Sequence, residues 1–274
     1  MTEVQVVEWL KRLAPATGSG VVLGIGDDCA IFRPRGSAQD LLFTTDQFIE
    51  GVHFRRSDSP ESVGHRALGR GLSDIAAMGG TPRFSLTSLT KPRNVSDAWL
   101  RRFYAGLVRL ASRFHTVLAG GDLASGPTLA CDVVVCGSVR RNGALRRDRA
   151  KPGDTIYVSG PLGGPASRNY PPRLFPPKVK LGQRLLGKAT ACIDITDGLA
   201  LDLHRLCVAS GVSAKLEKIP LVAGASVEHA LSGGDEYELL FTGRELGSFG
   251  IPVGVIEAGE PSFVQPSGYD HFRG

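Results

Sequence analysis

The sequence has no apolar run near the ~18 residues that a membrane-spanning helix needs, and residues 1–15 lack the apolar centre of a signal peptide. Its five cysteines are odd in number and scattered, so no disulfide framework is indicated and reduced thiols are expected. No tandem repeat or low-complexity tail is present. These absences predict a cytoplasmic protein with no membrane partner.

The formal net charge of +5 is the first positive feature, and by itself it favours a nucleic-acid partner. The most basic segment, Arg140–Arg149, contains no aromatic residue to stack on bases. A solvated loop or a phosphate clamp is therefore the better interpretation of that segment. We expect no nucleic-acid partner.

Helical and strand patterns alternate along the chain, which predicts a mixed α and β fold. A turn at Lys151–Asp154 divides it into a domain over residues 1–140 and a domain over residues 150–274. The six prolines between residues 160 and 177 predict a loop. Helices are expected over residues 3–14, 60–78, from Ser96 onward, 182–190 and 198–209. Strands are expected at Val21–Ile25, Cys29–Arg33, Leu41–Thr45, Phe84–Leu89, Val117–Ala119, Leu129–Val139, Thr155–Ser159 and Ile251–Ile256.

Aspartates recur beside glycine or threonine at the expected strand ends. A single such aspartate usually caps its own turn, but this arrangement occurs six times in a chain with 35 glycines. Glycine lets the backbone approach a ligand closely. Carboxylate and hydroxyl oxygens with no nearby histidine or cysteine favour Mg²⁺ or Ca²⁺ over zinc. If the six runs converge, they predict a nucleotide-phosphate site with several Mg²⁺ ions. The runs are Gly24–Asp28, Thr44–Asp46, Leu72–Asp74, Gly120–Asp122, Asp194–Gly198 and Gly233–Glu236.

Two apparent nucleotide motifs are rejected on their chemistry. Gly182–Lys188 nearly matches a Walker A loop, but Ala189 stands where a Mg²⁺-binding Ser or Thr belongs, and an ordinary basic helix is favoured. Gly24 and Gly26 lack the third glycine of a dinucleotide fingerprint.

Taken in order along nearly the whole chain, these runs together with Glu50–Phe54, Ala150–Asp154, Ser232–Leu240 and Gly268–Phe272 resemble the thiamine-monophosphate kinases. That family lies in the aminoimidazole-ribonucleotide-synthetase-like superfamily. The resemblance implies its two-domain fold and a homodimer joined through the N-terminal sheets. It also implies transfer of the γ-phosphate of ATP to thiamine monophosphate, giving thiamine diphosphate.

The resemblance assigns roles residue by residue. Asp74, Asp46 and Asp122 would be central to catalysis, and Asp74 would bridge several ions. The implied Mg²⁺ ligands are Asp28, Thr44, Thr45, Asp46, Asp74, Asp122, Asp194 and Asp197. The implied ATP contacts are Tyr104, Gly121, Asp122, Arg147 and Thr196. The implied contacts with thiamine monophosphate are His53, Glu236 and Tyr269.

Several assignments have a structural alternative. His53 could be a loop residue, Tyr104 a core residue, Tyr269 a packing anchor and Arg147 a solvated cation. The chain also departs from the family pattern: Asp148 and Arg149 replace Ser and Gly before Ala150, and Lys178 stands where Arg is usual. The segment after Gly160 is shortened by a helix.

Phosphoryl transfer to an already ionised phosphate needs charge neutralisation more than a general base. This suits a chain without a Ser–His or Cys–His pairing, and it predicts direct in-line transfer. Two alternatives remain at this point. One is a superfamily enzyme resembling selenophosphate synthetase or aminoimidazole-ribonucleotide synthetase; the other is a basic binding protein without catalysis. Residues 1–20 hold no cysteine, which argues against the selenophosphate branch.

Overall fold

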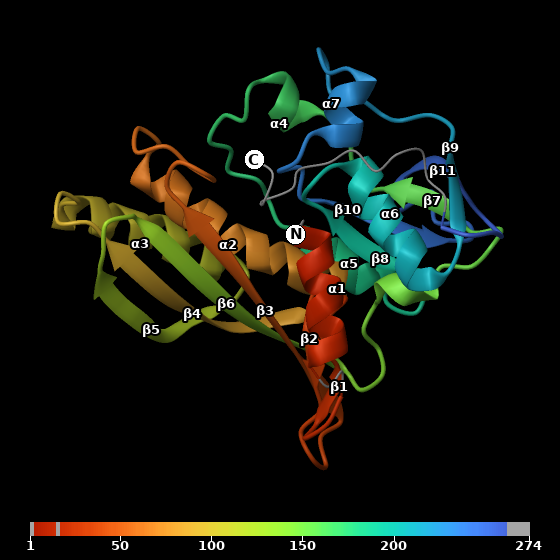
Figure 1. Cartoon of the computed structure of the whole chain (residues 1–274), viewed down its shortest axis with the longest axis horizontal. Helices are drawn as coiled ribbons and strands as arrows, with labels where there is room; N and C mark the ends of the chain where they lie inside the picture. Colours follow the sequence, from red (N-terminus) through yellow and green to blue (C-terminus); the bar gives the residue numbers. More distant parts are fainter. Residues whose placement is uncertain (1–2, 15–16, 262–274) are drawn as a thin grey trace.

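Two β-sheets organise the chain and lie side by side (Figure 1). The computed structural model describes residues 3–14 and 17–261. The mixed α and β class expected from the sequence is confirmed. No helix among these residues is long and apolar enough to cross a membrane.

The first sheet has the strand order β1-β2-β3-β6-β4-β5, and only the β4–β5 pair is parallel. The nearly all-apolar strand β6 lies between β3 and β4 in the interior of the sheet, as its composition favours. The strands are β1 (Val21–Leu23), β2 (Ala30–Phe32), β3 (Gln39–Ile49), β4 (Thr81–Lys91), β5 (Val117–Ser125) and β6 (Ala130–Arg140).

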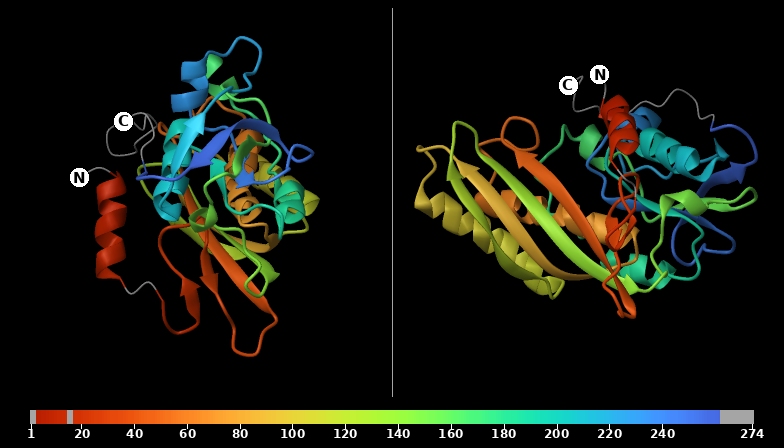
Figure 2. Two further views of the ribbon diagram at one scale, coloured as in Figure 1. Left: turned by 90° about the vertical axis from the view of Figure 1, so that its right-hand side faces the viewer. Right: turned by 60° about the horizontal axis from the view of Figure 1, so that its bottom comes forward.

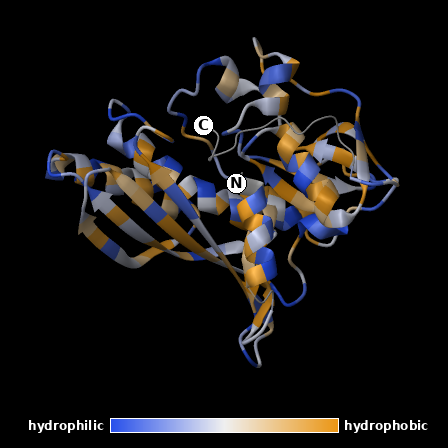
Figure 3. Cartoon of the chain, in the orientation of Figure 1, coloured by the Kyte–Doolittle hydropathy of each residue, from blue (hydrophilic) through white to orange (hydrophobic). Residues whose placement is uncertain are grey.

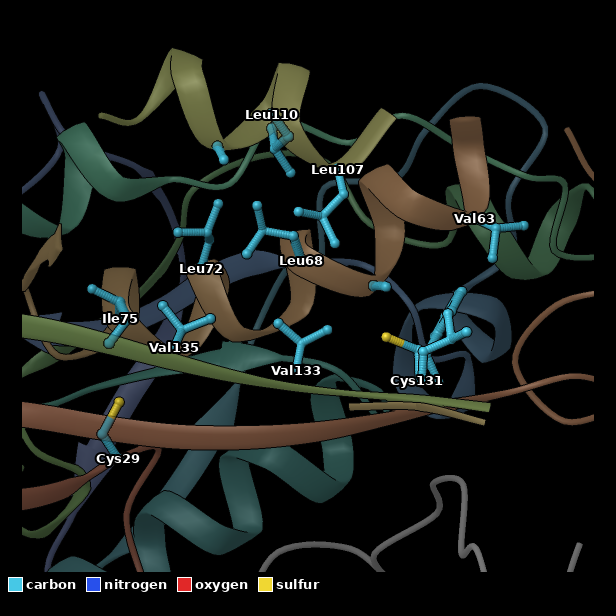
Figure 4. Close-up of a cluster of buried hydrophobic side chains, with 14 of the residues drawn as sticks. Cys29, Val63, Leu68, Leu72, Ile75, Leu107, Leu110, Cys131, Val133 and Val135 are labelled. Carbon is cyan, nitrogen blue, oxygen red and sulfur yellow. The ribbon is translucent and has the colours of Figure 1, made fainter. Parts of the chain in front are cut away.

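Helices α2 (Pro60–Ala77) and α3 (Asp97–Arg113) pack on one side of this sheet (Figure 2). Each begins at a serine whose Oγ accepts a backbone N–H, Ser59 for α2 and Ser96 for α3. Leu107 and Leu110 of α3 meet Leu68 and Leu72 of α2 above Val133 and Val135 of β6 (Figure 4). This apolar packing fixes the position of α2 over β3 and β6.

The second sheet is antiparallel, with the order β8-β10-β7-β11-β9. Helix α6 (Leu199–Ser210), which contacts strands of this sheet, carries both apolar and polar residues (Figure 3). Its strands are β7 (Thr155–Val158), β8 (Cys192–Ile195), β9 (Ser213–Leu216), β10 (Glu238–Gly243) and β11 (Ile251–Glu257). The remaining helices are α1 (Glu3–Leu13), η1 (Arg147–Arg149), α4 (Gly164–Ser167), α5 (Val179–Leu185), α6 (Leu199–Ser210) and α7 (Val227–Ser232).

The end of α2 joins the two sheets. Ala76 and Ala77 share an apolar cluster with Tyr157, Leu239 and Phe241 of the second sheet. Because Asp74 lies one turn earlier on the same helix, it is held at the junction of the sheets. The division into domains at residues 140 and 150 stays a prediction.

The local patterns predicted most elements but not all. The helix expected over residues 182–190 is instead α5, which begins at Val179 and ends at Leu185. The short buried strands β8 and β10 were not expected, because an apolar run of four to six residues carries little periodicity. The proline-rich segment is mostly loop, as predicted, with only the one-turn helix α4.

Candidate active site

Three of the predicted metal ligands meet at the junction of the sheets. One carboxylate oxygen each of Asp28, Asp74 and Asp194 lies within 4.8 Å of the others. Asp28 comes from the loop between β1 and β2, Asp74 from α2 and Asp194 from β8. Side chains far apart in the sequence therefore form one acidic cluster, which we call the Asp28–Asp74–Asp194 cluster.

Two hydroxyl groups orient this cluster. Thr44 Oγ1 donates to Asp74 Oδ2 at 2.5 Å, and Ser73 Oγ donates to Asp194 Oδ2 at 2.6 Å. Thr44 and Asp46 stand two residues apart on β3 and so face the same side of the sheet, toward α2. Thr45 faces the other side and is exposed. Of this predicted run, the structure brings the side chains of Thr44 and Asp46 to the cluster and leaves that of Thr45 outside it.

The expectation that all these aspartates stand at strand ends is wrong. Asp46 lies within β3 and Asp74 within α2. They meet because the face of α2 that packs on the sheet covers the middle of β3, so helix packing brings them together.

The cluster concentrates negative charge where water is scarce. Burial raises the pKa of Asp74 well above its usual range, and the charges of Asp46, Asp194 and Asp28 add to the effect. Burial and the charge of Asp28 also raise the pKa of Asp194. Burial raises the pKa of Asp27 to about 7. Among the described residues, Asp28 Oδ2 and Asp46 Oδ2 are buried without a hydrogen-bond partner. Such an all-oxygen, electron-rich set suits a hard divalent cation.

Arg147 is the cation next to the cluster. Its Nη2 donates to Asp28 Oδ1 at 2.5 Å, and its backbone N–H donates to Asp27 Oδ2 at 3.2 Å. The alternative of a solvated cation is wrong for this side chain, which is 19% exposed and ion-paired. One guanidinium cannot neutralise three clustered carboxylates and Asp46.

The Gly-Gly-Asp run of β5 lies elsewhere on the sheet. Pairing across β6 and β4 puts Gly121 three strands from Asp46, which is about 14 Å at the usual strand spacing. Asp122 is exposed on this edge strand. Gly121 has φ of 151°, and a Cβ there would lie 1.8 Å from the Thr87 carbonyl oxygen, so only glycine fits.

Tyr104 lies on α3, the helix that contacts β5. It packs edge-on against Phe103 and against the core beneath α3. This placement agrees with the core interpretation and does not test a contact with ATP.

A cleft of about 480 Å³ is lined by Arg70, one helical turn before Asp74, and by Thr196, two residues after Asp194. His53, Thr196 and Asp197, all predicted site residues, line it. The ring of His53 stacks on Phe48, and its Nδ1 accepts the N–H of Ile49 at 3.0 Å. His53 thus has both a structural contact and a surface in the cleft. Asp235, from the predicted run Gly233–Glu236, also lines the cleft, together with Arg66, Arg70 and Tyr170, which the sequence did not point to.

The turn after β8 is held by a buried carboxylate that the sequence analysis missed. Asp202 Oδ2 accepts the N–H groups of Thr196 and Asp197 at 2.9 and 3.0 Å. Arg205 Nη1 donates to Asp197 Oδ2 at 2.5 Å and to Asp202 Oδ1 at 2.7 Å. Asp197 is therefore oriented by Arg205 rather than gathered into the three-carboxylate cluster. The one local hint is that Asp202 lies in the first turn of α6 and so can accept N–H groups just before the helix.

The last two predicted substrate residues are placed differently. Glu236 is 1% exposed and accepts the N–H of Gly163 at 2.5 Å, behind the cleft that its neighbour Asp235 lines. Asp235 has φ of 62°, a left-handed conformation that is strained for a residue other than glycine and that recurs at functional sites. Tyr269 lies outside the described residues.

Glu236 gives a pH-dependent prediction. Burial raises its pKa to about 7 from 4.5, so the folded state holds a proton that the unfolded state has released. This contribution to stability is complete below pH 4.5 and is lost as the pH rises through 7. We expect Glu236→Gln, which keeps the acceptor oxygen, to remove on the order of 2–3 kcal/mol of this pH dependence.

The measurement is the free energy of unfolding in urea between pH 5 and pH 8, without divalent metal. Glu217→Gln, at an exposed position, is the matched control and should follow the wild type. Parallel pH curves for Glu236→Gln and wild type would contradict the prediction.

Comparison with known proteins first defines a class. Residues 26–139 match the family model of the AIR synthase related protein N-terminal domain. Three relatives place the chain more narrowly. It is 35% identical to the thiamine-monophosphate kinase of Haemophilus influenzae, over 81% of this chain and 75% of the relative. It is 34% identical to the enzyme of that name from Escherichia coli K12, over 92% of each chain. Its structure matches a solved complex of AaThiL with AMPPCP and TMP, with a TM-score of 0.87 and 29% identity over 99% of this chain and 97% of that one.

The chain belongs to the thiamine-monophosphate kinase family. The family named on the sequence motifs alone is confirmed, and so is the fold that it implied.

Proposed function

We propose that this protein transfers the γ-phosphate of ATP to thiamine monophosphate and releases ADP and thiamine diphosphate. The supporting observation is that a chain of this family gathers Asp28, Asp74 and Asp194 into one acidic cluster, while Arg70 and Thr196, close in sequence to Asp74 and Asp194, line the cleft. The relatives' names give the activity, and the AaThiL complex holds AMPPCP, an ATP analogue, together with TMP.

Several Mg²⁺ ions would be held by the oxygen-rich side of the site. The residues that fit are Asp28, Asp74 and Asp194, with Asp46 and the hydroxyl of Thr44 beside them. The buried, unpartnered oxygens of Asp28 and Asp46 support this proposal. Bound Mg²⁺ would neutralise phosphate charge and orient the phosphates. Thr45, Asp122 and Asp197 stay predicted ligands, and Asp122 would have to act through a nucleotide that spans the sheet or through a second copy of the chain.

The chain's own residues suit direct in-line transfer. The acceptor is a phosphate oxygen that is mostly ionised near neutral pH, so no general base is needed. Arg147, fixed by Asp27 and Asp28, presents a cation beside the carboxylates, where repulsion between the two substrates is greatest. His53 would orient thiamine monophosphate in the cleft, and Thr196, whose N–H is held by Asp202, would contact the nucleotide.

The test is formation of thiamine diphosphate from ATP and thiamine monophosphate, followed by chromatography with and without Mg²⁺. Product that depends on both substrates and on Mg²⁺ is expected. Salt-sensitive RNA binding, with neither product nor heat stabilisation by ATP and Mg²⁺, would favour the non-catalytic alternative.

We also propose that each chain has two domains, residues 1–140 and 150–274. Two chains would form a homodimer joined through the first sheet. The side chains of Leu86, Val117 and Leu123 on β4 and β5 are 36%, 62% and 69% exposed in the single chain. A second copy packed against this part of the sheet would remove that apolar surface from water. Sedimentation velocity at micromolar concentration distinguishes a dimer from a monomer.

A further inference from the structure

Arg70 borders both the cleft and the acidic residues. It stands on α2 one helical turn before Asp74, so the two side chains leave the same face of the helix. The Arg70 side chain lines the cleft with His53 and Thr196, and its Nε lies 3.6 Å from Asp46 Oδ1. The guanidinium therefore lies at the wall of the cleft and next to Asp46.

The guanidinium is held in place by groups that use few of its donors. Its Nη1 donates to the Tyr237 hydroxyl at 2.9 Å. Its Cζ lies 5.8 Å from the ring centroid of Phe48 and 5.9 Å from that of Tyr237. The nearest carboxylate oxygens, on Asp46 and Asp235, are 3.6 and 3.7 Å away, which is too far for a hydrogen bond.

Most donors of Arg70 make no hydrogen bond within the part of the chain that the structure describes. An arginine carries five N–H donors, and within residues 3–14 and 17–261 the only hydrogen bond of Arg70 is the one to Tyr237. Its Nε is buried without a hydrogen-bond partner among those residues. A buried donor without a hydrogen bond is unfavourable, and a bound anion would supply the missing acceptor.

The neighbouring Arg66 also lines the cleft and is bonded similarly. Its Nη2 donates to the carbonyl oxygen of His53 at 2.9 Å. It also pairs with Asp58 and Asp235, each at 3.5 Å. Arg66 and Arg70 therefore each make one hydrogen bond and two ion pairs, but among the described residues only Arg70 of the two has a buried nitrogen without a hydrogen-bond partner.

We propose that Arg70 binds the phosphate of thiamine monophosphate and so selects the phosphorylated acceptor over thiamine itself. This inference rests on the proposed function. A planar guanidinium matches two phosphate oxygens at once, which a single ammonium charge does not. The negative charge of Asp46 beside it would be offset by the divalent cations proposed at that carboxylate.

The test compares two ligands that differ only by the phosphate. Affinities of wild type and Arg70→Gln for thiamine monophosphate are measured by calorimetry with Mg²⁺ present, and thiamine is measured as a competitor. We expect Arg70→Gln to weaken thiamine monophosphate binding by about 10- to 100-fold, as for loss of hydrogen bonds to a charged group. Thiamine affinity and the KM for ATP should stay within about two-fold, because neither involves this contact.

The ratio of thiamine monophosphate affinity to thiamine affinity decides the outcome. Equal weakening of both ligands would show that Arg70 only supports the cleft wall, and no weakening of either would show that it does not bind phosphate. Either result overturns the inference. Arg70→Lys keeps the charge but not the fork, and it should give an intermediate ratio. If Arg70→Gln does not fold, the ratio for Arg70→Lys decides, and a ratio equal to that of wild type overturns the inference. Arg101→Gln, exposed on α3, removes the same charge elsewhere and should change nothing.

The outcome is separable from the proposed function. Wild type that forms no thiamine diphosphate refutes the kinase activity. An active wild type whose selectivity survives Arg70→Gln refutes only the role of Arg70.

Discussion

Replacement of Asp74 by Asn is expected to lower kcat for thiamine diphosphate formation by roughly 10³-fold, the scale seen when one preorganised charge-stabilising group is lost. Asp74 is the carboxylate that shares its surroundings with Asp28, Asp194 and Asp46. An amide of the same shape keeps the bond from Thr44 but removes the charge that would hold divalent cations.

The same substitution should stabilise the metal-free protein. Burial and three nearby carboxylates raise the pKa of Asp74, so ionising it in the folded state is unfavourable. A neutral Asn removes that penalty at pH values above the ordinary carboxyl pKa of 3.8. The expected pair of results is a higher thermal midpoint without metal and a smaller rise of the midpoint when Mg²⁺ is added.

Opposite changes in activity and stability separate this prediction from simple misfolding. The measurements are kcat and thermal midpoints with and without Mg²⁺, and Asp97→Asn, at an exposed position, is the control. Near-normal turnover by Asp74→Asn would refute the role assigned to this carboxylate.

The sequence was sufficient to name Asp28, Asp74 and Asp194, because each lies in a motif that is readable locally. It could not show that they meet while Asp122 lies some strands away, since that depends on the strand order of the first sheet. Arg70 and Asp202 escaped for a related reason. Their partners Tyr237 and Thr196 come from other elements, and neither arginine nor aspartate on a helix is unusual by itself.

The glycine content illustrates the same limit. The sequence suggests that glycines shape turns around metal and phosphate, and Gly121 has the restricted backbone that such a role requires. Other glycines have a different task. Gly64 of α2 and Gly106 of α3 let the two helices touch backbone to backbone. Helix packing, rather than ligand binding, accounts for this part of the glycine excess.

This close contact leads to the largest stability effect that we expect. A Cβ on Gly64 would lie 2.0 Å from the Phe103 carbonyl oxygen, and a Cβ on Gly106 would lie 2.0 Å from that of Glu61. Alanine favours a helix over glycine by about 1 kcal/mol. Overpacking against rigid backbone costs about 1–3 kcal/mol and occasionally more, so at this separation the overlap should outweigh the helix preference.

We expect Gly64→Ala and Gly106→Ala each to lower the free energy of unfolding by about 2–3 kcal/mol or more, measured in urea. Gly247→Ala is the matched control, because a Cβ there meets nothing within 4 Å. Because α2 also carries Asp74 and Arg70, its displacement should lower kinase activity in the variants that still fold. A Gly64→Ala protein about 1 kcal/mol more stable than wild type would mean that helix propensity prevails and that the helices separate freely.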